Sequence, residues 1–233
     1  MKMKVSVVLP TYNERDNIAP LIEAIMREAS PYEIIVVDDD SPDGTWRVVE
    51  ELGDRYPNLR LLRRIGRRGL TSALQEGISM AQGNAVVWMD CDFSMPPEAI
   101  PRLIHALRHS DIAVGSRYVP GGGDSREFSR VLTSRIFNAF ATLMLDRGIR
   151  DYTSGFLAVK KKVFYKVKLR GDYGEYCIDF LYKAAESFKI TEVPYVNVPR
   201  RMGETKTAPK IKDLLRHGVN YSLYVLKLRI GGL

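Results

Sequence analysis

The stretch "VVWMDCDFSMPP", residues 86–97, places Asp90 and Asp92 directly after an apolar run. The run from Ala85 to Met89 predicts a buried strand, and the prolines that follow allow a helix to begin near Pro97. An ionised carboxylate is very costly to bury unless it is paired or binds a metal. The segment therefore predicts a strand whose carboxyl end presents two acids to a partner or a ligand.

The same alternation of strand and helix extends on both sides of this stretch. Short apolar runs predict strands, and apolar residues at helical spacing predict helices between them. Continuous apolar strands that alternate with helices predict a parallel sheet covered on both faces, an α/β fold. The expected strands are 5–9, 34–37, 59–62 and 85–89, and the expected helices are 17–29, 46–52, 70–81 and 97–108, with Asp43 as the helix cap before Trp46.

Acidic residues follow three of these four strands. Glu14 comes after the first, Asp38–Asp40 after the second, and Asp90 with Asp92 after the fourth. Parallel α/β sheets bind ligands at the carboxyl ends of their strands, where the strand order reverses. The acids therefore indicate one ligand site at that edge.

The second half of the chain is less regular. The loop "SRYVPGGGDSRE", residues 116–127, has a length typical of functional loops, and Gly121–Gly123 is expected to be flexible. A second loop, "PRRMGETKTAPK", residues 199–210, is basic. Strands are expected at 111–115, 155–159 and 190–198, and helices at 129–145, 175–187 and 211–230.

Composition limits the class of protein. The 233 residues include 35 Lys and Arg against 28 Asp and Glu, a net charge of +7, which favours polyanionic partners. No nucleic-acid-binding motif accompanies this charge, so nucleic acid is not expected as a partner. No signal peptide and no spanning apolar segment are recognised. Cys91 and Cys177 form no metal-binding or disulfide pattern, which fits a reducing cytoplasm.

Asp90 and Asp92 are the sharpest chemical feature. Residues i and i+2 of an extended segment point to the same side, so both carboxylates can converge on one ligand. Mg²⁺ or Mn²⁺, held by one or two carboxylates and by substrate phosphates, would suit them. The alternative is that Asp92 caps the helix at Pro97 while Asp90 is solvated. A P-loop is absent, and no GxGxxG follows the first strand.

The ordered motifs resemble those of a known family. They are "VVLPTYNERDNI" (7–18), "IIVVDDDSPDGT" (34–45), "GLTSALQEGISMAQGNAVVWMDCDFSMPP" (69–97), "VGSRYVPGGG" (114–123), "DYTSGF" (151–156) and "EVPYVNVPRRMGETK" (192–206). Over roughly residues 4–206 the chain resembles the inverting glycosyltransferases of family 2, most closely the polyprenyl-phosphate enzymes exemplified by dolichol-phosphate mannose synthases. The resemblance implies a GT-A fold, a Rossmann-like and mostly parallel sheet with helices on both faces.

The resemblance also implies site residues. Its nucleotide pocket would be lined by Pro10, Tyr12 and Glu14, with Val37 and Asp39 contacting base and ribose. Cys91 stands where the family usually has Ala between its two aspartates. Asp92 would be the main ligand of Mg²⁺ or Mn²⁺, with Ser94 as a weaker second ligand. Catalytic roles fall to Asp90, Asp92 and Arg117, and the phosphate-binding residues would be Arg117, Arg200 and Lys206.

The implied reaction transfers mannose from GDP-mannose to dolichyl (polyprenyl) phosphate and gives a β-linked product. A phosphate acceptor is already ionised near neutral pH, so the site needs cations to hold it rather than a base. Arg130 or Arg135 could add to those cations, and Arg201 could replace Arg200. The alternatives are another donor such as UDP-glucose, a hydroxyl acceptor, or a catalytically silent module that binds a nucleotide sugar.

The apolar and basic residues of the last expected helix predict that it contacts a membrane surface. We expect a catalytic domain at 1–207 and an amphipathic segment at 208–233, which would bind the membrane interface or a partner. The helix at 129–145 could join it, although both helices could instead pack on the core or on another subunit. The expected location is the cytoplasmic face of the membrane, peripherally or with a separate membrane subunit. The apolar face comprises Ile211, Leu214, Leu215, Val219, Leu223, Leu226 and Ile230, and the charges are Lys210, Lys212, Arg216, Lys227 and Arg229.

Overall fold

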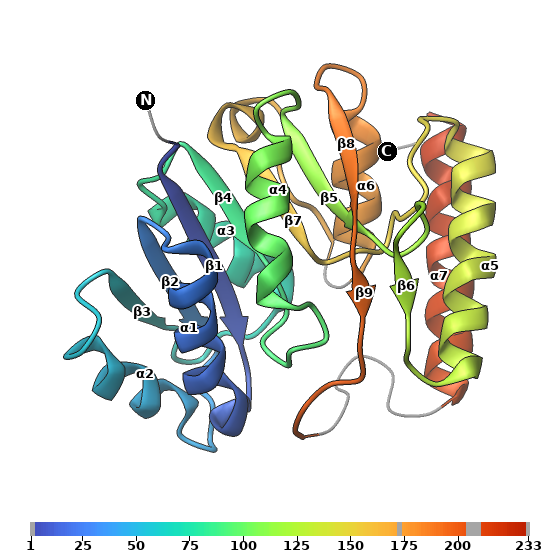
Figure 1. The fold of residues 1–233 in the computed structure, drawn as a ribbon. Coiled ribbons are helices and arrows are strands. Elements are labelled where there is room, and N and C mark those ends of the chain that lie inside the picture. The colour runs from blue at the N-terminus through green and yellow to red at the C-terminus, as the bar shows by residue number, and fades with distance from the viewer. Residues whose placement is uncertain (1–2, 172–173, 204–210, 232–233) are drawn as a thin grey trace.

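The computed structural model describes residues 3–171, 174–203 and 211–231, with the backbone alone for 211–215 and 217. A seven-stranded sheet forms its centre, in the order β3-β2-β1-β4-β7-β5-β8 (Figure 1). Its strands are β1 (Val5–Thr11), β2 (Glu33–Asp38), β3 (Leu59–Arg63), β4 (Ala85–Trp88), β5 (Ile112–Ser116), β7 (Leu157–Lys160) and β8 (Ile190–Pro194). All neighbours are parallel except β7, which runs antiparallel to β4 and β5. The predicted α/β class with a mostly parallel sheet is confirmed.

Helices cover both faces of this sheet (Figure 1). They are α1 (Arg15–Ala29), α2 (Thr45–Gly53), α3 (Leu70–Met80), α4 (Ile100–Ala106), α5 (Phe128–Leu145), α6 (Glu175–Ala184) and α7 (Ile211–Arg229), with short 3₁₀ turns η1 (Pro97–Ala99) and η2 (Lys161–Tyr165). Successive strand residues point to opposite faces. Val7 and Val87 accordingly belong to one core, whereas Val8 and Trp88 belong to the other. Both faces of the central strands are therefore buried, as their continuous apolar sequence predicts.

The strand order reverses beside β1. The chain proceeds outward from β1 through β2 to β3, and then returns to place β4 on the other side of β1. The acid-bearing segments that follow β1, β2 and β4 consequently leave the sheet at one edge.

Three expected details differ in the structure. The strand expected at 190–198 divides into β8 and β9 (Val196–Asn197), and only β8 joins the central sheet. The glycine run is not simply flexible, because Gly123 and Asp124 form β6, which pairs with β9. Asp43 lies one residue before the N-cap of α2, which is Gly44, although its carboxylate still accepts a hydrogen bond from the Thr45 amide at 2.9 Å.

Helices α5 and α7 lie side by side at one end of the molecule (Figure 1). In α7, Val225 and Leu228 are buried in the core, whereas Val219, Leu223, Leu226 and Ile230 are exposed. The exposed four belong to the predicted apolar face, and the rest of that face (Ile211, Leu214 and Leu215), with Lys210 and Lys212, lies outside the described side chains. Among the described residues no helix is long and apolar enough to cross a membrane.

Candidate active site

A cavity of about 700 Å³ opens at the carboxyl edge of the sheet. It brings together most of the residues that the sequence singles out: Pro10, Tyr12, Glu14, Asp39, Asp90, Cys91, Asp92, Ser94, Arg117 and Arg200. The expected contact of Val37 with the nucleotide is wrong, because the Val37 side chain is fully buried in the core and does not line the cavity. Lys206 lies outside the described residues.

Two carboxylates of this cavity share one guanidinium group. Arg200 Nη2 lies 3.0 and 3.1 Å from the two Glu14 carboxylate oxygens, and Arg200 Nη1 lies 3.7 Å from Asp92 Oδ2. Arg201 instead places its guanidinium over the Phe93 ring, 5.1 Å from the centroid. Of the two adjacent arginines, Arg200 is therefore the one that faces the acids.

The alternative role of Asp92 as a helix cap is wrong. Its Oδ1 accepts a hydrogen bond from the Ser94 amide at 3.0 Å, and the turn that begins at Pro97 has no side-chain cap. The bond to Ser94 holds the Asp92–Ser94 segment in a tight turn. Asp92 and Ser94 therefore sit together on the cavity wall.

Asp90 lies in the cavity with two other acids, Asp92 and Glu14, close enough to affect its charge. Although Asp90 is exposed to the cavity, desolvation by the surrounding protein, followed by the charges of Asp92 and Glu14, raises the pKa of Asp90 to about 7, and Arg200 opposes this shift only in part. A carboxyl group surrounded in this way favours any added cation. Among the described residues no group of three or more His, Cys, Asp and Glu side chains is arranged to hold a metal alone. A divalent ion here would therefore need oxygen ligands from a substrate as well.

Asp39, which also lines the cavity, has a carboxylate that already accepts hydrogen bonds from other residues of the chain. Arg64 Nε donates to Asp39 Oδ1 at 2.7 Å, and the Gly69 amide donates to Oδ2 at 2.8 Å. The Arg64 side chain is fully buried, and Arg68 lies 3.6 Å over the Tyr12 ring centroid. Sequence analysis missed both arginines, although the segment "RRIGRRG", residues 63–69, follows a strand at the same edge.

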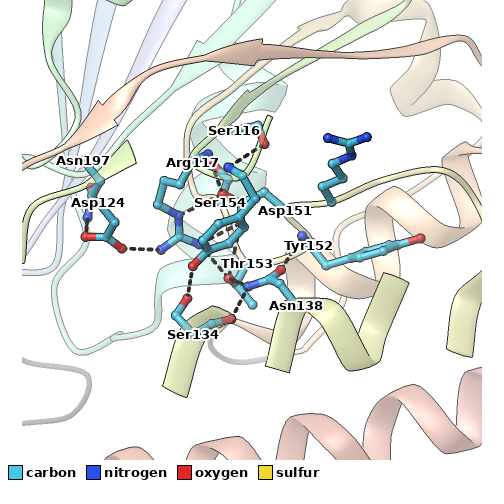
Figure 2. A network of polar contacts seen from close by, with 12 residues as sticks. Ser116, Arg117, Asp124, Ser134, Asn138, Asp151, Tyr152, Thr153, Ser154 and Asn197 are labelled. Carbon is cyan, nitrogen blue, oxygen red and sulfur yellow. Dashed lines mark hydrogen bonds and ion pairs between the residues drawn. The ribbon is translucent and has the colours of Figure 1, made fainter. Parts of the chain in front are cut away.

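Arg117 is also held by protein carboxylates, and it is not a solvated charge (Figure 2). Its guanidinium forms two hydrogen bonds of 2.8 and 2.7 Å with Asp151, and its Nη1 lies 3.6 Å from Asp124. Arg126, which the sequence analysis missed, binds Asp124 through two hydrogen bonds of 2.9 and 2.7 Å. Neither aspartate was predicted to take part.

Two further cations were suggested by sequence as phosphate ligands. Arg130 lines the cavity beside Arg126, both near the start of α5. Arg135 is exposed and does not line it. On the α5 side, the basic part of the cavity wall therefore comes from Arg117, Arg126 and Arg130, whereas Arg68 and Arg200 lie on the side of Tyr12 and Glu14.

Apolar groups line the remaining end of the cavity, between α5, α6 and α7. Phe137, Tyr176, Gly218 and Tyr221 contribute to this wall. The Tyr221 hydroxyl accepts a hydrogen bond from the Gly174 amide at 3.1 Å, and its ring packs edge-on against Phe137 with centroids 5.8 Å apart. Sequence analysis expected the last helix to bind the membrane interface or to pack on the core or a partner, and missed that it also forms part of the cavity wall.

Comparison with known proteins places this site in a family. The sequence profile of the family described as "Glycosyl transferase family 2" matches residues 6–168. The chain belongs to this family. The resemblance inferred from the motifs is thereby confirmed.

Curated relatives extend the similarity beyond the profile. The chain is 43% identical over 222 residues to a protein of Pyrococcus furiosus named dolichol-phosphate mannosyltransferase, with 92% of this chain and 62% of that relative covered. It is 37% identical to the polyprenol monophosphomannose synthase of Mycolicibacterium smegmatis, covering 86% and 79%. It is 34% identical to the undecaprenyl-phosphate mannosyltransferase of Micrococcus luteus, covering 98% and 100%.

Solved structures support the fold. Glucosyl-3-phosphoglycerate synthase from Mycobacterium tuberculosis, solved with Mn²⁺, uridine diphosphate and glucosyl-3-phosphoglycerate, superposes with a TM-score of 0.73. The match covers 98% of this chain and 80% of that chain at 20% sequence identity. At this identity the likeness establishes the shared fold.

Proposed function

We propose that this protein transfers mannose from GDP-mannose to a polyprenyl (dolichyl) phosphate, with inversion, and so forms a β-linked polyprenyl phosphate mannose. The observation that carries the proposal is the chemical division of the cavity. Acids lie at the strand ends together with Arg200, three arginines lie after β5 and near the start of α5, and apolar side chains lie between α5, α6 and α7. A nucleotide diphosphate, a phosphate and a hydrocarbon chain match these three regions in turn. The names of the three relatives specify mannose and a dolichol, polyprenol or undecaprenyl phosphate lipid, which supports the sugar and the acceptor.

Asp92 and Ser94 would hold Mg²⁺ or Mn²⁺ together with the donor's diphosphate. The fit rests on the proximity of Asp90, Asp92 and Glu14 in the cavity, where desolvation and then the charges of the other two acids raise the pKa of Asp90 to about 7. Hard divalent cations accept one or two carboxylates completed by substrate phosphates. Such an ion would stabilise the negative charge that grows on the departing diphosphate.

The chain's own residues would position the two substrates. Tyr12 and Asp39 line the donor side of the cavity, where Arg68 lies over the Tyr12 ring and Arg64 and the Gly69 amide hold the Asp39 carboxylate in place. Arg117, Arg126 and Arg130 offer positive charge to an acceptor phosphate. A phosphate monoester carries about 1.5 to 2 negative charges at pH 7, so its oxygen needs no base to become a nucleophile. A single displacement by that oxygen inverts the configuration at the anomeric carbon.

A lipid acceptor also implies a membrane surface. The outward side of α5 exposes Phe128, Leu132, Ile136 and Leu143, next to the exposed apolar residues of α7. We propose that segment 208–233 and α5 contact the cytoplasmic face of the membrane, alone or with a separate membrane subunit. Apolar area and positive charge together favour an anionic lipid surface.

The test is a transfer assay with radiolabelled donor. We expect the protein, Mn²⁺ and polyprenyl phosphate to convert GDP-mannose to a mannosylated lipid and GDP, and a chelator to stop the reaction. UDP-glucose and a neutral polyprenol serve as alternative donor and acceptor. Transfer from UDP-glucose alone would contradict the donor, and transfer to the neutral alcohol but not to the phosphate would contradict the acceptor.

A further inference from the structure

Arg117 follows the carboxyl end of β5 and is the most tightly held cation of the cavity wall. Its side chain is only 6% exposed, and the guanidinium lies between Asp124 on one side and Asp151 on the other (Figure 2). Asp151 Oδ2 accepts hydrogen bonds from the Arg117 backbone amide at 3.0 Å and from Nε at 2.8 Å. Asp151 Oδ1 accepts one from Nη2 at 2.7 Å.

These bonds leave one end of the guanidinium available. Nη2 also donates to Thr153 Oγ1 at 2.8 Å, so both Nε and Nη2 are occupied. Within the described part of the chain, Nη1 makes no hydrogen bond, and its nearest carboxylate oxygen is Asp124 Oδ2 at 3.6 Å. Because Arg117 lines the cavity, Nη1 is the donor that a ligand there can recruit.

The carboxylate that grips Arg117 is itself fixed. Asp151 is fully buried, and its backbone amide donates to Glu192 at 3.0 Å. Thr153 Oγ1 accepts a hydrogen bond from Asn138 Nδ2 of α5 at 2.9 Å, which ties this corner to the helix (Figure 2). Burial opposes the charge on Arg117, but Asp151 raises the pKa of Arg117 well above its ordinary value. The guanidinium is therefore permanently charged and held in one orientation.

We propose that Asp151, supported by Thr153, is a positioning residue that orients Arg117 so that Nη1 binds the acceptor phosphate. The proposal rests on the proposed function and adds residues that do not themselves contact the reacting atoms. A guanidinium whose orientation is fixed before binding loses little conformational freedom when an anion arrives. Loss of the hydrogen bonds from Arg117 to Asp151 or Thr153 should consequently weaken acceptor binding and leave donor binding unchanged.

The experiment measures KM for polyprenyl phosphate and for GDP-mannose separately. Asp151→Asn leaves only one acceptor oxygen for the Arg117 donors, and we expect the acceptor KM to rise about 10-fold or more. Thr153→Val is the milder variant, because every donor that binds Thr153 keeps a second acceptor. For it we expect a rise of about 2- to 10-fold. The donor KM should stay within about 2-fold in both variants, as expected for a group on the acceptor side.

Controls separate positioning from stability. Asp111→Asn removes another ion-paired carboxylate at the opposite end of β5 and should change neither KM. Lysine lacks the forked guanidinium donors of arginine, so in the Arg117→Lys protein there is no guanidinium left for Thr153 to orient. Adding Thr153→Val to that protein should therefore raise the acceptor KM little further.

Three results would contradict the inference. If the wild type transfers mannose to the phosphate but Thr153→Val and a folded Asp151→Asn keep the wild-type acceptor KM, only the positioning role is overturned. If Thr153→Val raises the acceptor KM equally in the wild type and in the Arg117→Lys protein, Thr153 acts by contacting the substrate itself and not through Arg117. A wild type that never uses the phosphate would overturn the proposed function and this role together.

Discussion

Asp92 has the most specific assignment of any single residue in this site. It lies on the cavity wall within reach of Arg200 and beside Ser94. We predict that Asp92→Asn lowers turnover about 10²- to 10³-fold, as removal of one group that stabilises the leaving charge typically does. The thermal midpoint should hardly change, since removal of this acid relieves repulsion on Asp90. The exposed Asp54→Asn variant is the control and should keep full activity.

Glu33 provides a prediction on pH and stability away from the cavity. Burial raises its pKa, but hydrogen bonds from Ser6 and the Gln82 amide, both 2.6 Å, and from Arg60 outweigh burial and lower the pKa below its ordinary 4.5. Its stabilising effect is therefore complete above about pH 4.5 and disappears as the pH falls through the lower folded-state value.

The matched variant is Glu33→Gln, followed by denaturant unfolding at several pH values. We expect it to be less stable than the wild type at pH 7, with a difference that narrows in acid. A constant difference between pH 7 and pH 3 would contradict this account of Glu33.

Individual residues were predictable from sequence where the signal was local. Asp90 and Asp92 stand out because they directly follow an apolar strand, and the structure brings them to the cavity. The partners of Arg117 and Asp39 were not predictable, because Asp151 and Arg64 lie 34 and 25 residues away along the chain. Only the packing of β5 against β7, and of β2 against β3, makes these pairs.

At the scale of elements, helix α3 lies close to the sheet at Gly77, which has no side chain to separate it from strands β1 and β2. A Cβ atom on Gly77 would lie 2.4 Å from a Val8 methyl and 3.0 Å from a Val37 methyl. We predict that Gly77→Ala destabilises the fold by about 1–3 kcal/mol through overpacking, despite the better helix propensity of alanine.

The control for this prediction is Gly53→Ala at the end of α2, where a Cβ meets nothing within 4 Å. That variant should be neutral or slightly stabilising in thermal or urea unfolding. Equal stability of the two variants would mean that α3 can move away from the sheet without cost.

Helices and strands with a strong periodic pattern were predictable from sequence, whereas the partner of each strand in the sheet and the direction of β7 were not. The helices and the first four strands appear close to their expected ranges. The antiparallel direction of β7 could not be read from its short apolar run, because periodicity carries no information on strand direction. The division between β8 and β9 coincides with Pro194 and Tyr195, beyond which the chain leaves the main sheet to pair with β6.

For the whole molecule, the exposed apolar side of α5 and α7 predicts where it meets a membrane. We expect Leu223→Ser combined with Ile230→Ser to reduce cosedimentation with anionic vesicles several-fold, because both side chains are exposed and the chain carries a net charge of +7. Ile65→Ser removes an equally exposed apolar residue from the loop after β3 and should leave vesicle binding intact. Equal losses for both proteins would contradict a membrane surface confined to the two helices.

The whole account depends on a divalent ion shared by Asp92 and a nucleotide diphosphate at the carboxyl edge of the sheet. The most direct test is a Mn²⁺ titration followed by electron paramagnetic resonance, with GDP present and absent, on the wild type and Asp92→Asn. We predict that GDP creates a bound Mn²⁺ signal in the wild type and that the substitution removes it, because the part of the chain that the structure describes holds no group of three or more His, Cys, Asp and Glu side chains able to bind the ion alone. A nucleotide-dependent Mn²⁺ signal of equal strength in Asp92→Asn would contradict the account.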